Sequence, residues 1–99
     1  MIVDIEVVPQ PLGTEADNYA HVEAAIALAQ ASGLHYEVNA LGTTIEGQPD
    51  AVWPLLRAMH ESCLASGAHH VITVLKVAEH ADTASQPTIA GLTGKFRRT

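Results

Sequence analysis

Acidic, amide and hydroxyl side chains alternate with apolar ones in three short β-branched segments, and such groups can hydrogen-bond a cationic ligand. Alternate residues of a strand point to the same face of a sheet. If the apolar residues of these segments face the core, the opposite face carries Asp4, Glu6, Glu37, Asn39, Thr44 and Glu46. Four of the eleven carboxylates then share one face. This face is either a solvated strand surface or a cleft that attracts a cation, which would relieve the repulsion between the carboxylates.

The six histidines and the single cysteine form no metal or nucleophile motif. His69 and His70 are adjacent, so a strand points them to opposite faces, and no His-Glu-x-x-His pattern is present. His60 lies three residues before Cys63, but Cys63 belongs to an apolar helical stripe and has no evident activating base. The chain also lacks Gly-x-Ser-x-Gly and a glycine-rich phosphate loop. We therefore expect no catalytic residue, no metal and no resident cofactor.

The charge balance excludes several classes of partner. The chain has 99 residues, with 5 basic and 11 acidic side chains and a formal net charge of −6. Nucleic acids and anionic membranes require a basic surface, so neither is expected as a partner. No apolar stretch reaches the roughly 18 residues that cross a bilayer, and the first residues do not resemble a signal peptide. With one cysteine only, we expect a single cytoplasmic domain over residues 1–99.

The hydrophobic pattern predicts the elements that would position these side chains. Thr14 and Asp17 form a helix-start signal, and Asp50 is expected to cap a second helix that has Pro54 in its first turn and ends at Gly67. The residues over 70–77 are apolar on both faces, which is typical of a central strand in a covered sheet. The predicted elements are a strand over 2–8, a helix over 16–32, a hairpin of strands over 35–39 and 42–47, the second helix and the strand over 70–77.

A short internal repeat indicates how these elements combine. Ala-Ser-Gly-Leu-His at 31–35 and Ala-Ser-Gly-Ala-His at 65–69 are the same helix ending and strand entry. The order is therefore β-α-β twice. Two right-handed βαβ units that share one antiparallel sheet, with both helices on one face, form a ferredoxin-like sandwich. After a polar loop over 79–87, the segment over 92–98 could add one more edge strand.

Three of the five basic residues lie within the last five positions of the chain, at Lys95, Arg97 and Arg98. They either keep an edge strand or frayed tail from aggregating, or form a contact in which the tail of one subunit meets the acidic face of another. The sequence leaves both interpretations open.

Four segments, in the same order along residues 1 to about 82, resemble motifs of the small thiamine-binding proteins of the MTH1187/YkoF-like superfamily, formerly a domain of unknown function. VPQPLGT at 8–14 is similar to the opening "VxPLGT", and SGLHYEV at 32–38 to the strand entry "G-L-x-Y-x-hydrophobic". LGTTIEG at 41–47 resembles "M-G-T-x-I-E-G". His60 and Glu61, with Ala-Ser-Gly-Ala at 65–68, resemble "A-H-E-x-x-x-x-x-G-A".

This resemblance implies a ferredoxin-like subunit that assembles into dimers or tetramers and binds thiamine or a related aminopyrimidine without chemistry, in vitamin salvage, transport or sensing. An acidic, hydroxyl-bearing face suits the positive thiazolium ring and the hydrogen-bonding edge of the aminopyrimidine. We expect Glu46 to bind the aminopyrimidine, and Tyr19 to stack on a ring. The expected ligand-binding residues are Glu46, Thr44, Thr43, Asn39, Glu6 and Tyr19.

Two alternatives belong to other functional classes. The first is a small enzyme of the dimeric α/β-barrel type, which would use a histidine or carboxylate between the sheet and the helices. The second is an oligomerisation module without a ligand. The absence of a nucleophile–base pair in the sequence favours the binding protein over the enzyme.

Overall fold

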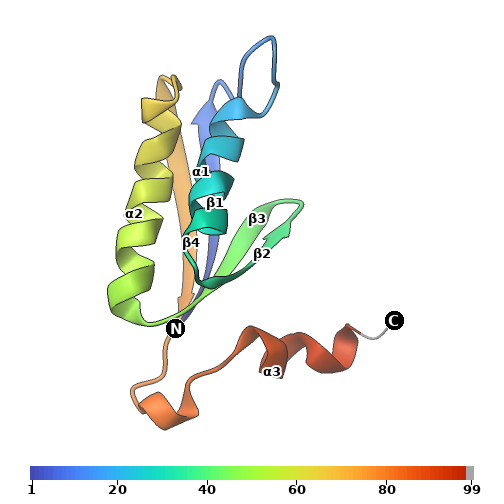
Figure 1. The fold of residues 1–99 in the computed structure, drawn as a ribbon, viewed down its shortest axis with the longest axis vertical. Helices are drawn as coiled ribbons and strands as arrows, with labels where there is room; N and C mark the ends of the chain where they lie inside the picture. Colours follow the sequence, from blue (N-terminus) through green and yellow to red (C-terminus); the bar gives the residue numbers. More distant parts are fainter. Residues whose placement is uncertain (98–99) are drawn as a thin grey trace.

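A four-stranded antiparallel sheet carries two long helices on one face in the computed structural model, which describes residues 1–97 (Figure 1). The strand order is β2-β3-β1-β4. This arrangement confirms the predicted β-α-β-β-α-β ferredoxin-like sandwich. The elements are β1 (Ile2–Gln10), α1 (Ala20–Ala31), β2 (His35–Asn39), β3 (Gly42–Glu46), α2 (Pro49–Ala65), β4 (His70–Ala78), the 3-10 turn η1 (Thr83–Ser85), α3 (Ile89–Thr93) and the 3-10 turn η2 (Gly94–Phe96).

The predicted alternation of faces is confirmed by the register of β1 with its two neighbours. Val3 lies opposite Ile45 of β3 and Val77 of β4, and Asp4 lies opposite Thr44. Residues directly opposite each other in an antiparallel pair point to the same face. One face therefore packs on the helices, and the buried core comprises Met1, Val3, Ile5, Ala25, Ala29, Ile45, Val52, Leu56, Met59 and Cys63.

Both long helices end at the predicted glycines. Gly33 has φ +78° and Gly67 has φ +125°, a region that side chains with a Cβ adopt only under strain. Each glycine follows a serine at the C-cap of its helix. The repeated Ala-Ser-Gly segments are thus the stop signals of α1 and α2.

Helix α1 begins at Ala20, four residues later than predicted. The amide of Asp17 donates to Thr14 Oγ1 at 3.2 Å, the amide of Thr14 donates to the Asp17 carbonyl at 2.7 Å, and the amide of Tyr19 donates to Asp17 Oδ1 at 3.1 Å. The short polar side chains therefore hold the backbone in a local turn that competes with the helix.

Prolines shift two further boundaries. Strand β1 continues through Pro9, which lies opposite Val71 of β4. Strand β3 pairs only with residues 2–5 of β1, so no β3 residue lies beside Pro9, and its missing N–H costs no hydrogen bond to β3. Helix α2 begins at Pro49 rather than at an Asp50 cap, because proline suits the first helical position. Pro54 therefore lies in the second turn, where it is exposed to solvent.

The prediction of a central strand over 70–77 was wrong, because β4 is at the edge of the sheet and pairs with β1 alone. Ile72 and Val74 are each 54% exposed. Apolar residues on both faces of a strand indicate that both faces make contacts, but they do not determine the position of the strand in the sheet. The two helical crossovers determine that position, and they bring β4 to the outer side of β1.

The predicted extra edge strand over 92–98 is also wrong for the residues that the structure describes, which end at 97. The segment forms short helical turns, and α3 is capped by Thr88, whose Oγ1 accepts from the amide of Gly91 at 2.9 Å. Thr93 Oγ1 donates to the Ile89 carbonyl at 2.7 Å. These local side-chain bonds favour helical turns over an extended strand. Across the bottom of Figure 1, the C-terminal segment (residues 79–97) runs below the β2–β3 hairpin.

Within residues 1–97, no helix combines the length and the apolar character needed to span a membrane.

Candidate functional site

The polar face of the sheet contains a row of side chains that crosses all four strands. Glu37 of β2 lies opposite Thr44 of β3, Thr44 lies opposite Asp4 of β1, and Asp4 lies opposite Lys76 of β4. Thr44 Oγ1 donates to Asp4 Oδ1 at 3.3 Å. The register therefore brings carboxylates from separate segments to one face, as the alternation predicted.

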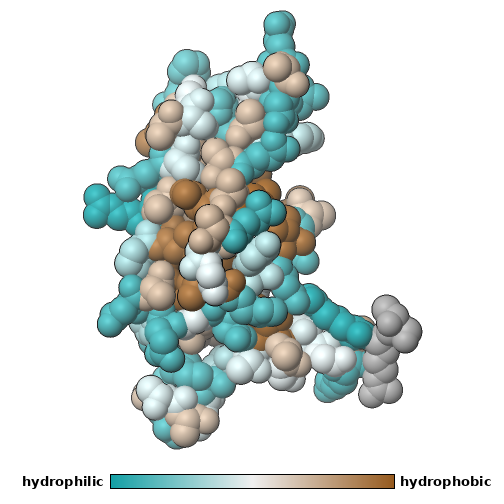
Figure 2. Space-filling model, viewed as in Figure 1, coloured by the Kyte–Doolittle hydropathy of each residue, from teal (hydrophilic) through white to brown (hydrophobic). Residues whose placement is uncertain are grey.

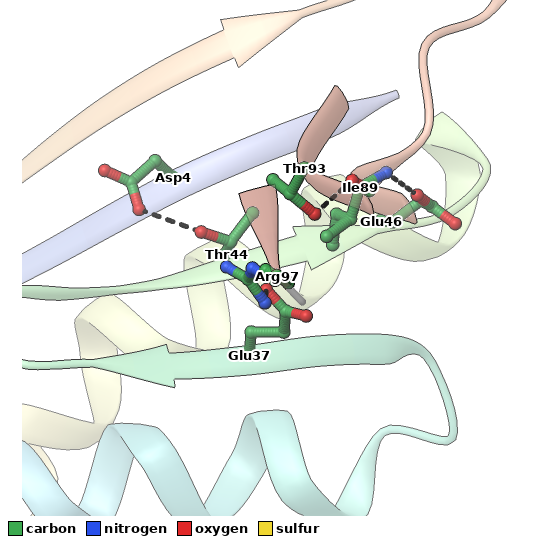
Figure 3. A network of polar contacts seen from close by, with 7 residues as sticks. All are labelled: Asp4, Glu37, Thr44, Glu46, Ile89, Thr93 and Arg97. Carbon is green, nitrogen blue, oxygen red and sulfur yellow. Dashed lines mark hydrogen bonds and ion pairs between the residues drawn. The ribbon is translucent and has the colours of Figure 1, made fainter. Parts of the chain in front are cut away.

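The C-terminal segment covers part of this face (Figure 3). The guanidinium of Arg97 forms an ion pair with Glu37, and the amide of Ile89 donates to Glu46 Oε1 at 2.5 Å. The basic tail thus meets the acidic face of its own chain. Arg98, which belonged to the same prediction, lies outside the described residues.

A hollow of about 510 Å³ lies beside this row on the polar face. Its walls combine two carboxylates, one ammonium group and short polar side chains with the apolar side chains of the hairpin tip and of β4. The lining residues are Asp4, Glu6, Asn39, Leu41, Gly42, Thr44, Val74 and Lys76.

A second cavity, of about 270 Å³, lies between α1 and the sheet, and we call it the α1 cavity. Apolar side chains make most of its wall: Ile5, Val7, Val8, Leu12, Val22, Ala25, Ile26, Leu41 and Met59 line it. Its polar residues are Thr43 and Tyr19, together with Glu6 and Asn39, whose side chains belong to the polar face by the strand alternation. Figure 2 shows apolar residues concentrated in the middle of the side of the molecule on which the helices lie, whereas the top of the molecule, where the β1–α1 loop lies, is hydrophilic.

The structure divides the six expected ligand-binding residues among three places. Thr43 and Thr44 point to opposite faces, since Thr43 pairs with Ile5 and Thr44 with Asp4. Glu6 and Asn39 line both cavities, whereas Tyr19 and Thr43 line only the α1 cavity, and Thr44 lines only the hollow. Glu46 lines neither.

The apolar rim of the α1 cavity was not recognised from the sequence. Leu41 at the tip of the β2–β3 hairpin is 81% exposed, and Leu12 and Tyr19 are also exposed large side chains. A leucine at a hairpin tip is unusual, because polar residues and glycine dominate turns. That local anomaly is the signal that could have identified this rim.

Carboxyl groups gather at the start of α1, beside the rim of the cavity. A side-chain hydrogen bond with Glu23 lowers the pKa of Asp17, and the backbone amide of Tyr19 acts in the same direction. The same contact raises the pKa of Glu23. Asp17 therefore carries its negative charge throughout the neutral pH range.

The thiol and two of the histidines are engaged away from both cavities. Burial raises the pKa of the Cys63 thiol, which makes it a poor nucleophile. His21 Nδ1 lies 2.6 Å from Ser66 Oγ, and His60 Nδ1 lies 2.5 Å from Thr73 Oγ1. Among residues 1–97, no three His, Cys, Asp or Glu side chains are grouped so that they could hold a metal ion.

This combination of a ferredoxin-like sandwich and an apolar cavity edged by polar side chains is that of a small ligand-binding domain. Solved structures share the fold. A domain of unknown function from Bacillus cereus has a TM-score of 0.84 and 34% identity, over 97% of this chain and 88% of that one. A Thermotoga maritima structure, named as a candidate thiamine biosynthesis/salvage protein, has a TM-score of 0.80 over 97% of both chains, at 23% identity.

The chain belongs to the thiamine-binding protein family, whose model matches residues 3–92. A UPF0045 protein of Synechocystis is 33% identical over 82 residues, which are 83% of this chain and 66% of that protein. A UPF0045 protein of Clostridium perfringens is 30% identical over 59 residues, which are 60% of this chain and 62% of that protein. The chain thus matches somewhat less than two thirds of the length of these two relatives. The family match confirms the resemblance seen in the sequence motifs.

Proposed function

We propose that this protein binds thiamine, or its aminopyrimidine portion, in the α1 cavity and does not transform it chemically. The observation that carries the proposal is that four of the six expected residues, from separate segments of the chain, line one apolar cavity, and that Thr43 and Tyr19 are among them. The family match supports thiamine as the ligand, and so does the name of the Thermotoga maritima structure.

The chemistry of the α1 cavity suits the two rings of thiamine. Its apolar wall removes ring surface from water, and the exposed ring of Tyr19 at the rim can stack on a heterocycle. The hydroxyl of Thr43 can hydrogen-bond the aminopyrimidine. Glu6 and Asn39 also line the cavity, but their side chains lie on the polar side of the sheet. Pockets with mostly apolar walls and a few polar groups are typical small-molecule sites.

Binding without turnover is supported by the state of the groups that could act as nucleophiles. The hydroxyl of Ser66 donates to the Cys63 carbonyl at 3.0 Å. With the hydroxyl hydrogen on the Cys63 carbonyl, His21 Nδ1 donates to Ser66 Oγ, and in this arrangement the imidazole does not accept the proton of that hydroxyl. Among the side chains that line the α1 cavity, no nucleophile lies beside a base. A binding protein of this kind suits vitamin salvage, transport or sensing in the cytoplasm.

We propose further that the subunits assemble through β4. Its outer edge is unpaired over nine residues among those described, and it exposes Ile72, Val74, Leu75 and Val77. A long apolar edge strand promotes association with another strand. Light scattering measures the molecular mass of the wild type and of two variants. Val74→Lys changes an exposed residue of β4, and Leu64→Lys changes an exposed residue of α2 and is the control. We expect only Val74→Lys to reduce the mass to that of a monomer; a monomeric wild type would contradict the proposal.

Isothermal titration of the purified chain with thiamine, the aminopyrimidine half and the thiazole half tests the ligand. We expect saturable binding of thiamine in the micromolar range, about −8 kcal/mol, weaker binding of the aminopyrimidine half, and the weakest binding of the thiazole half. Incubation of the complex followed by mass spectrometry tests for turnover. Absence of heat with all three compounds, on folded protein, would overturn the proposed ligand, and a new product would overturn the absence of chemistry.

A further inference from the structure

We propose that the α1 cavity selects unphosphorylated thiamine and rejects its mono- and diphosphate esters. This inference rests on the proposed function, and concerns the chemical form of the ligand that the site accepts. It follows from three features of the cavity and its rim: the engaged amides at the start of α1, the carboxylates there, and the location of the basic side chains.

The start of α1 is the position where a phosphate would ordinarily bind, because the first amides of a helix lack partners within it. In this chain three of the four amides at residues 19–22 already have acceptors. The amide of Ala20 donates to the Asp17 carbonyl at 3.2 Å, that of His21 donates to the Leu12 carbonyl at 3.0 Å, and that of Tyr19 donates to Asp17 Oδ1 at 3.1 Å. A phosphate at the rim would have to displace these bonds.

The charge at the rim also opposes a phosphate. Asp17 and Glu23 lie together at the start of α1, beside the rim of the cavity. These carboxylates favour the positive thiazolium ring, but they repel a phosphate group that carries close to two negative charges at neutral pH. The same groups therefore attract one end of the phosphorylated ligand and repel the other.

No described basic side chain lines the α1 cavity to offset this repulsion. Recognition of a phosphate ordinarily requires arginine or lysine. Arg57 forms an ion pair on α2, and Arg97 forms one with a carboxylate of β2. Lys95 lies over the ring of Phe96, and Lys76 lines the hollow on the other face of the sheet. The cavity thus discriminates by charge as well as by shape.

Titration calorimetry with thiamine, thiamine monophosphate and thiamine diphosphate, in one buffer, tests this selectivity on the full chain. For the wild type we expect the dissociation constant of the diphosphate to exceed that of thiamine by a factor of about ten or more, with the monophosphate between them. Three single variants, each removing one carboxylate charge, assign the cause. Asp17→Asn keeps an oxygen acceptor for the amide of Tyr19, Glu23→Gln changes an exposed side chain, and Glu79→Gln is a control beyond the end of β4.

We expect Asp17→Asn and Glu23→Gln each to reduce the diphosphate-to-thiamine ratio by a factor of about three, and Glu79→Gln to leave it unchanged. Equal affinity of the wild type for thiamine and the diphosphate overturns the selectivity and leaves the proposed function intact. A ratio that changes equally in all three variants overturns the role of the rim. Failure of all three compounds to bind overturns the proposed function, and this inference with it.

Discussion

Arg97 places its guanidinium against the carboxylate of Glu37, sixty positions earlier in the chain, and so joins the C-terminal segment to the edge strand β2. Without this contact, the segment would be held by the buried side chain of Ile89 and by the bond from the Ile89 amide to Glu46. The pair also removes one negative charge from the acidic face. The last residues described therefore determine how much of that face a ligand or partner can reach.

Removal of the pair is expected to loosen the C-terminal segment with little effect on global stability. The two side chains are 49% and 24% exposed, and ion pairs of this kind contribute about 0.2–1 kcal/mol. We expect Arg97→Ala to lower the free energy of unfolding by no more than about 1 kcal/mol while accelerating amide exchange over residues 89–96. Arg57→Ala, which breaks an exposed pair on α2, is the control. Equal exchange in the wild type and Arg97→Ala would show that the pair does not hold the segment.

Thr43 and Thr44 allow the two cavities to be distinguished by the same substitution at neighbouring positions. Thr43→Val removes a hydroxyl from the α1 cavity, and Thr44→Val removes one from the hollow on the other face. One hydrogen bond to the ligand contributes about 1 kcal/mol or more. We therefore expect calorimetry to show thiamine affinity reduced about five- to ten-fold by Thr43→Val and unchanged by Thr44→Val. The reverse result would move the site to the polar face.

Glu46 was expected from the sequence to bind the aminopyrimidine, and the structure provides a test of that role. Its Oε1 accepts from the amide of Ile89, and it lines neither cavity. We expect Glu46→Ala to accelerate amide exchange at Ile89 and to weaken thiamine binding less than Thr43→Val does. A ten-fold or larger loss of affinity in Glu46→Ala, with the C-terminal segment still protected, would instead support its assignment to the site.

Gly67 and Gly33 end α2 and α1 in the same way, but their surroundings differ. A Cβ at Gly67 would lie 3.2 Å from His21 Cε1, whereas a Cβ at Gly33 would meet nothing within 4 Å. Both positions have positive φ. We expect Gly33→Ala to cost about 1 kcal/mol of unfolding free energy and Gly67→Ala about 2–3 kcal/mol, measured by urea denaturation. Equal costs would indicate that backbone strain alone matters at these positions.

The carboxyl pair at the start of α1 predicts opposite titration shifts in its two members. The hydrogen bond with Glu23 lowers the pKa of Asp17 in the folded state, so this group stabilises the fold above its unfolded pKa, and that stabilisation is lost as pH falls through the folded value. The pKa of Glu23 is raised, so its contribution is present at low pH and is lost as pH rises through the folded pKa.

Carbon-detected NMR titration of the side-chain carboxyl groups measures both values. We expect Asp17 to titrate below the range of ordinary aspartates and Glu23 above that of ordinary glutamates. In Asp17→Asn, the hydrogen bond between the two carboxyl groups and the coulombic repulsion by Asp17 are both removed, and the pKa of Glu23 should move toward its ordinary value. Unshifted titration of both groups would contradict the pairing, and with it one of the supports for charge selectivity at the rim.

Local sequence patterns were sufficient for the two long helices, the four strands of the sheet and the face on which each residue of these strands lies, but not for the C-terminal segment. The alternation around Val3 and the helical spacing around Val52 depend only on the geometry of a strand and of a helix. Helix starts were predicted less well, because Thr14 and Asp17 can either cap a helix or form a separate turn. The choice between the two depends on the loop that precedes α1, which packs on the rest of the fold.

The sequence alone determined that an acidic polar face exists. The apolar residues of each strand must face the core, and the two-residue period of a strand then puts Asp4 of one strand and Glu46 of another on the opposite side. Only the tertiary structure decided which of these residues lie together. The register of β1 with β3 puts Glu46 opposite Ile2 rather than near Glu6, and the C-terminal segment then engages it. Such proximities arise from contacts between distant segments, which a local periodicity does not encode.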